Sequence, residues 1–123
     1  QNVAIGTFHG PVTKAVGVTG SSVDTGVPLN EGWHTFGVIW TSSSVSWTLD
    51  GQVYNTLDKY ASSDGWKGLL DQPYFLVLNL AMGGTFVGNA SNGYRPDDGL
   101  HSQMLVDWIH YSKYNGEGTL YRH

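Results

Sequence analysis

A run of alternating apolar residues, followed by one tight-turn dipeptide, constrains the fold of this chain most. Within residues 34–40, aromatic or aliphatic side chains occupy every second position at Phe36, Val38 and Trp40. The same period of two continues through residues 44–49. Such alternation is typical of β-strands with one buried face. Asp50-Gly51 then precedes residues 52–56, and Asp-Gly between two such runs favours a β-hairpin. The sequence therefore predicts three antiparallel strands in these segments.

Further strand patterns extend over most of the remaining chain, and they predict an all-β fold. The additional strands are expected at residues 2–9, 12–18, 74–80 and 103–114. Two segments rich in Gly, Asn, Asp and Ser, 19–32 and 84–102, are expected to be loops, and 58–62 to form a single helical turn. This pattern of strands predicts an antiparallel β-sandwich of two packed sheets.

Composition limits the classes of protein to which the chain can belong. Its 123 residues are 40% hydrophobic and 13% charged, which is enough for one folded domain with a core. The net charge of -4 argues against a nucleic-acid partner, which would need a basic face. No apolar run reaches the ~18 residues of a membrane span. The absence of cysteine excludes disulfides and thiolate chemistry, and it fits a secreted and a cytosolic protein equally well.

Five segments in the same order resemble a β-1,3-glucanase (laminarinase) of glycoside hydrolase family 16. They are residues 6–11, 32–40, 45–54, 71–84 and 104–111. The resemblance reaches to about Tyr114, and it implies a concanavalin-like jelly roll with a substrate cleft across its concave sheet. It also implies a secreted retaining endo-β-1,3(4)-glucanase that hydrolyses β-glucans such as laminarin.

The chain departs from that family where catalysis is concerned. The family's catalytic motif is Glu-x-Asp-x-x-Glu or Glu-x-Asp-x-Glu, whose alternate acids share one face of a strand. Two carboxyl groups about 5 Å apart suit retaining hydrolysis. This chain contains no such motif, and its only glutamates are Glu31 and Glu117. We therefore expect no catalytic residue within residues 1–123, and we expect the Glu dyad to lie upstream of Gln1. The chain is then the C-terminal half of one sandwich domain, and its partner is the N-terminal half.

The resemblance and the residue types together give five candidate substrate-binding residues. Aromatic rings stack on sugar faces, and amides and imidazoles bond to sugar hydroxyls. On these grounds we expect His9, Trp66, Gln72, Asn79 and Phe86 to line the glucan cleft. Alternative roles stay open for four of them: a turn-capping His9, a strand-entry Gln72, an Asn79 that ties down a loop, and a Phe86 that covers the core edge.

Asp107 is the candidate metal ligand. It lies between apolar Leu105 and Ile109 on the same expected strand face, where an unpaired carboxylate would be costly. In the resemblance, the matching aspartate binds a structural Ca²⁺, a hard cation that prefers oxygen ligands. A structural hydrogen-bond network is the alternative, and no catalytic cofactor is expected.

Two functions from different classes therefore compete. The first is a glucan hydrolase of which this chain is an inactive half. The second is a non-catalytic β-glucan recognition module, which resembles the enzymes but has lost the glutamates. A lectin-like sandwich of unrelated specificity is a third and weaker interpretation. The residues before Gln1 would separate the first two, because glutamate at both motif positions indicates an enzyme.

Overall fold

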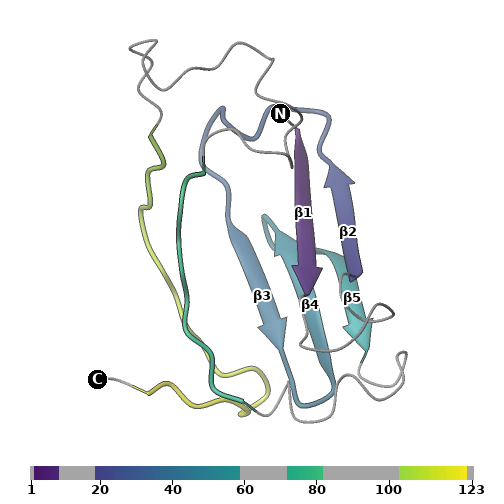
Figure 1. Ribbon diagram of the computed structural model, residues 1–123, viewed down its shortest axis with the longest axis vertical. Coiled ribbons are helices and arrows are strands. Elements are labelled where there is room, and N and C mark those ends of the chain that lie inside the picture. The colour runs from purple at the N-terminus through teal and green to yellow at the C-terminus, as the bar shows by residue number, and fades with distance from the viewer. Residues whose placement is uncertain (1, 9–18, 59–71, 82–102, 122–123) are drawn as a thin grey trace. The chain divides into compact units, whose positions relative to one another are not determined.

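The computed structural model describes residues 2–8, 19–58, 72–81 and 103–121 (Figure 1). The chain divides into two units. One comprises Gln1–Pro73 with Ser112–His123, and the other comprises Tyr74–Tyr111. All five strands belong to the first unit, and they form two antiparallel sheets. The all-β prediction is confirmed.

A two-stranded sheet pairs β1 (Val3–Phe8) with β2 (Thr19–Asp24), in a register that runs from Val3 opposite Asp24 to Phe8 opposite Thr19. The strand β1 lies within the predicted 2–9. The strand β2 lies in a segment predicted to be a loop, and that prediction was wrong. Its sequence, TGSSVD, has a single apolar residue, so local pattern gave no strand signal. Pairing with β1 decides its conformation, as strand formation depends strongly on context.

A three-stranded meander follows the predicted order. It contains β3 (Phe36–Trp40), β4 (Ser44–Leu49) and β5 (Gln52–Asp58), all antiparallel with β4 in the centre. The turn between β4 and β5 is formed by Asp50 and Gly51, whose φ angles are 50° and 80°. Positive φ at both central residues is the hairpin geometry that Asp-Gly favours, because it matches the twist of the strands. The hairpin prediction is confirmed.

The core lies between these two sheets, over the central strand β4. Val45, Trp47 and Leu49 of β4 and Ala4 of β1 are buried, and the first two form a cluster with part-buried aromatic and aliphatic side chains. The members that pack against the cluster are Phe8, Trp40, Tyr54 and Leu57. The alternate positions of β4 face this cluster, as the period of two predicts. Trp47 is therefore the central residue of the core.

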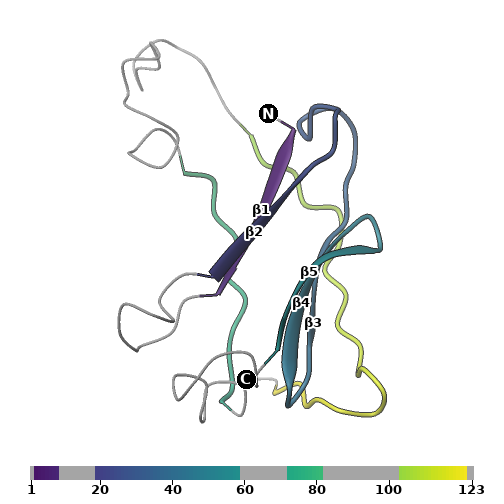
Figure 2. The same cartoon turned by 90° about the vertical axis from the view of Figure 1, so that its right-hand side faces the viewer.

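Gly6 of β1 lies close to Trp47 of the other sheet. A Cβ atom at this position would lie 2.5 Å from Cγ of Trp47 and 2.7 Å from its Cδ1. Atoms of real side chains do not come so close, so the indole occupies the space that any other residue at position 6 would need. Glycine is required here for contact between the layers, which are seen edge-on in Figure 2.

The predicted strands at 74–80 and 103–114 are not observed as strands. Residues 73–81 and 103–113 have no regular secondary structure, and the described residues of both segments are exposed. A strand is stabilised by a hydrogen-bonded neighbour, and the described part of the chain supplies none to these segments. Only Tyr114 forms an isolated bridge, with Glu117, across a turn in which Asn115 and Gly116 have positive φ. Propensity alone was not sufficient here.

Candidate functional site

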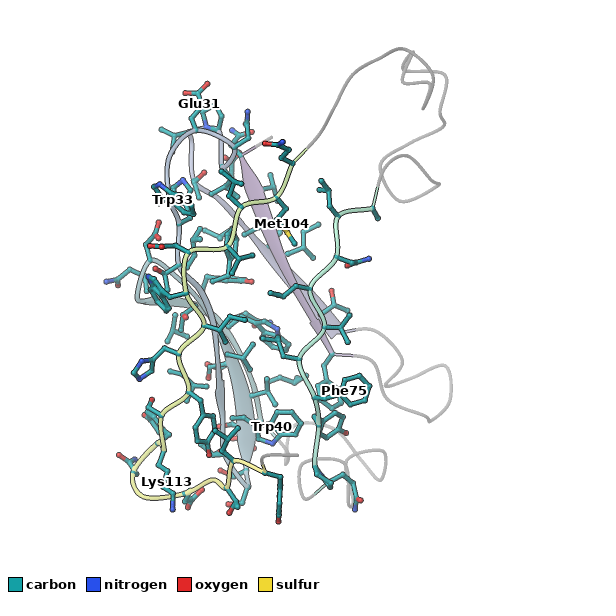
Figure 3. All side chains as sticks on the ribbon, turned by 90° about the vertical axis from the view of Figure 1, so that its left-hand side faces the viewer. Glu31, Trp33, Trp40, Phe75, Met104 and Lys113 are labelled. Atoms are coloured by element: carbon teal, nitrogen blue, oxygen red, sulfur yellow. The ribbon has the colours of Figure 1, made fainter. Side chains whose placement is uncertain are left out.

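Two predicted substrate-binding residues lie on the described segment 72–81. Gln72 and Asn79 are both exposed. Phe75 and Val77, which share a face with Asn79 in the predicted alternation, are 89% and 67% exposed, and Leu76 and Leu78 of the other face are 65% and 49% exposed (Figure 3 labels Phe75). The exposed fractions therefore do not distinguish one side of this segment from the other. A role of Gln72 or Asn79 in glucan binding stays a prediction.

The other three predicted substrate-binding residues, His9, Trp66 and Phe86, lie outside the described residues. Of the predicted set, the structure therefore describes Gln72 and Asn79 alone. The predicted absence of a catalytic residue and the expected upstream Glu dyad likewise stay predictions.

Asp107 lies in the described segment 103–121 and is exposed, between Leu105 and Ile109, which are 69% and 64% exposed. Within the described ranges, no three His, Cys, Asp or Glu residues are close enough to hold a metal ion. Calcium usually takes six to eight oxygen ligands, so Asp107 alone does not constitute a site. The described residues by themselves do not fit the ion, and calcium binding stays a prediction.

The best-defined polar cluster was missed by sequence reasoning. Nδ1 of His34 lies 2.8 Å from Oδ2 of Asp50, and the Thr35 backbone N–H donates to Oδ1 of Asp50 at 2.8 Å. The Asp50 N–H in turn donates to the Thr35 carbonyl at 2.8 Å. We call these three residues the His34–Asp50 clasp. The Asp-Gly dipeptide revealed the turn, but only the β3–β4 register reveals that its carboxylate meets the residues preceding β3.

The clasp has a defined electrostatic arrangement. The hydrogen bond from His34, followed by that from the Thr35 backbone, holds the pKa of Asp50 below its ordinary value of 3.8. Because the carboxylate accepts, Nδ1 of His34 carries the proton. Nε2 is buried and has no hydrogen-bond partner among the described residues. The clasp orients the imidazole and ties the turn to the start of β3, which is a structural rather than a hydrolytic role.

The depressed pKa of Asp50 predicts a pH dependence of stability. The folded protein binds the Asp50 proton less tightly than the unfolded chain, so the clasp contributes stability above pH 3.8 and loses it as the pH falls through the lower folded pKa. Asp50→Asn keeps a residue that tolerates the turn but cannot ionise. Urea denaturation at several pH values should show wild type losing its advantage over Asp50→Asn below pH 3.8. Equal pH slopes for both proteins would contradict this.

No helix long and apolar enough to span a membrane occurs in the part of the chain that the structure describes. The unassigned aromatic side chains include Trp33, which precedes the clasp and is 67% exposed, and Trp108, which is 59% exposed (Figure 3 labels Trp33). Trp108 lies within the predicted strand 103–114, and its segment has no strand neighbour among the described residues.

Comparison with known proteins gives consistent similarities. The sequence model of Glycosyl hydrolases family 16 matches residues 5–110. A Glucan endo-1,3-beta-glucosidase of Cryptopygus antarcticus is 35% identical over 94 residues, covering 68% of this chain and 34% of that protein. The Endo-1,3-1,4-beta-glycanase ExsH of Rhizobium meliloti is 30% identical over 113 residues, covering 89% and 20%. Glucan endo-1,3-beta-glucosidase A1 of Niallia circulans is 27% identical over 90 residues, covering 66% and 12%.

The chain spans about a third or less of the length of these curated relatives. No solved structure matches it significantly.

Proposed function

Because the chain belongs to Glycosyl hydrolases family 16, we propose that it is part of a secreted, retaining endo-β-1,3(4)-glucanase that hydrolyses β-glucans such as laminarin. The observation that carries the proposal is the family match over residues 5–110. The similarity to relatives named as glucan endo-1,3-beta-glucosidases supports the substrate class. The order of the strands in the first unit is compatible with a sandwich.

In this proposal the chain contributes binding surface rather than the reacting carboxylates. The sequence has no Glu-x-Asp-x-x-Glu or Glu-x-Asp-x-Glu motif, so the nucleophile and the acid/base belong to the other half of the domain. His9, Trp66, Gln72, Asn79 and Phe86 remain the candidates for contact with the glucan. Amides such as Asn79 suit sugar hydroxyls, and aromatic rings suit sugar faces.

The proposal predicts that the complete domain hydrolyses glucan and that residues 1–123 alone do not. The complete domain should release reducing ends from laminarin or lichenan, whereas residues 1–123 alone should release none, because the carboxylates that react are absent. A reducing-sugar assay on both proteins, with heat-inactivated protein as the control, measures this. A complete domain that is inactive on both glucans would overturn the enzyme proposal, and activity of residues 1–123 alone would overturn the placement of the acids.

The second candidate, a non-catalytic β-glucan recognition module, is kept because the deciding motif is absent from this chain. It predicts a complete domain that binds laminarin in calorimetry and hydrolyses none.

The main proposal also includes a structural calcium ion bound by Asp107. Unchanged thermal stability of the complete domain after chelation of calcium would contradict this part. The main proposal includes secretion as well, and retention of the expressed protein inside its native cells would contradict that part.

A further inference from the structure

Two turns of this chain share one backbone shape but differ in what surrounds them. Asp50 and Gly51 have φ angles of 50° and 80°, and Asn115 and Gly116 have φ angles of 50° and 83°. Positive φ at both central residues is the geometry of a two-residue hairpin. The first turn joins β4 to β5 inside a three-stranded sheet, whereas the second lies outside any strand of the described residues.

The turn at Asn115 is held by a single pair of residues. The Tyr114 N–H donates to the Glu117 carbonyl at 3.2 Å, and the Glu117 N–H donates to the Tyr114 carbonyl at 2.9 Å. Among the described residues this isolated bridge has no further ladder beside it. Even a complete two-stranded hairpin is only marginally stable in water when it stands alone. The turn at Asn115 therefore opens much more readily than the turn in the sheet.

The side-chain amide of Asn115 and the backbone nitrogen that follows it are both accessible. Asn115 is exposed, and neither its side chain nor the Gly116 N–H bonds to any described residue. Asp50 is held differently. Its N–H donates to the Thr35 carbonyl, and the Thr35 N–H donates to its carboxylate, both at 2.8 Å. No such contact restrains Asn115 among the described residues when its turn opens.

We propose that Asn115-Gly116 is a site of spontaneous deamidation. Hydroxide removes the proton of the Gly116 N–H, and the nitrogen attacks Cγ of Asn115. The new N–Cγ bond closes a succinimide ring, the Cγ–Nδ2 bond breaks, and ammonia leaves with a proton from water. Water then opens the ring at either carbonyl and gives aspartate or isoaspartate, so the reaction consumes one water and releases one ammonia. Glycine favours the attack because it has no Cβ to crowd its nitrogen.

The modification changes both the charge and the shape of this segment. Either product adds one negative charge to a chain whose net charge is -4, two residues before Glu117. Isoaspartate also routes the main chain through the former side chain and so lengthens the turn by one atom. Because loop length selects the turn type, the pairing of Tyr114 with Glu117 should be lost. The inference does not depend on the proposed glucanase function.

Peptide mapping by mass spectrometry tests the proposal on the complete domain, incubated at mildly alkaline pH in water enriched in heavy oxygen. The tryptic peptide of residues 114–122 should exchange its amide for a carboxyl that carries one heavy oxygen, and it should separate into aspartate and isoaspartate forms. The rate should lie within about threefold of that in a synthetic peptide of residues 112–121, because the turn gives little protection. A rate in the protein more than about tenfold below that of the peptide would overturn the proposal.

Asp50→Asn supplies the matched control within the same molecule. It places an Asn-Gly dipeptide in the sheet-bound turn, where the amide oxygen can still accept from the Thr35 N–H. In a variant that circular dichroism shows to be folded, position 50 should deamidate roughly tenfold or more slowly than Asn115. Equal rates at the two positions would overturn the proposal. If the variant does not fold, the comparison with the synthetic peptide decides alone.

Two further results bear on the route and on the position. Gly116→Ala should slow the reaction in the complete domain and in the peptide alike, because the added methyl crowds the attacking nitrogen; an unchanged rate in both would exclude the succinimide route. Asn92-Gly93 is the other Asn-Gly dipeptide of the sequence and lies outside the described residues, in a different tryptic peptide. Deamidation at Asn92 with Asn115 intact would overturn the assignment.

Discussion

Gly6→Ala is expected to lower the free energy of unfolding of the protein by about 1–2 kcal/mol. The added methyl would lie 2.5 Å from Cγ of Trp47, and the indole is held in the core by its neighbours, so either the ring or the backbone of β1 must move. Overpacking of a core costs roughly 1–3 kcal/mol, which exceeds the ~0.5–1 kcal/mol that alanine gains over glycine within a strand. Urea denaturation measures the difference.

The control for Gly6→Ala is Ile5→Ala on the same strand. Ile5 is 51% exposed and points to the opposite face, so its replacement should cost less than about 1 kcal/mol. A Gly6→Ala protein within about 0.5 kcal/mol of wild type would show that the layers can separate without penalty. That result would contradict the close contact between Gly6 and Trp47.

Trp47→Ala is expected to have the largest effect of any single substitution discussed, about 3–5 kcal/mol. Trp47 is 9% exposed and lies at the centre of the cluster with Val45, against side chains from both sheets. Removal of the indole leaves a cavity between the sheets, and a loss of this size is comparable with the ~5–15 kcal/mol that stabilises a typical domain. Circular dichroism during thermal unfolding would show a large decrease in Tm.

Two further variants distinguish a cavity effect from general damage. Trp47→Phe retains an aromatic ring and should recover part of the loss. Gly6→Ala combined with Trp47→Ala should cost less than the sum of the single changes, because a methyl at position 6 no longer meets an indole. Additive effects would mean that the two residues are not coupled, and they would place the main contact of Trp47 elsewhere.

The sequence predicted those elements whose stabilising partners are close along the chain. Asp50-Gly51 and the apolar alternation on either side identified the β4–β5 hairpin, because turn and strands agree locally. The strand β2 was missed because its polar residues owe their conformation to β1. Conversely, residues 74–80 have strong strand propensity, but they form no ladder among the described residues.

The candidate site shows the same limit. The clasp between His34 and Asp50 depends on the register of β3 against β4, which no local motif reveals. The predicted glucan-binding residues were identified through the family resemblance, and only Gln72 and Asn79 of these lie within the described ranges. Their function depends on a cleft that several segments must build together, so their residue types suggest the chemistry without fixing the geometry.

The contact between Gly6 and Trp47 also has a mechanical consequence. The indole fills the space that a side chain on β1 would need, so the two layers cannot slide along the strand direction unless the ring leaves that space. This contact fixes the position of β1 along the strand direction relative to β4. The hydrogen-bonded ladder between paired strands is stiff, so a neighbouring strand paired with β1 would be held in the same position. A single tryptophan in the interior would thus set the alignment of groups presented on the far surface of the sheet.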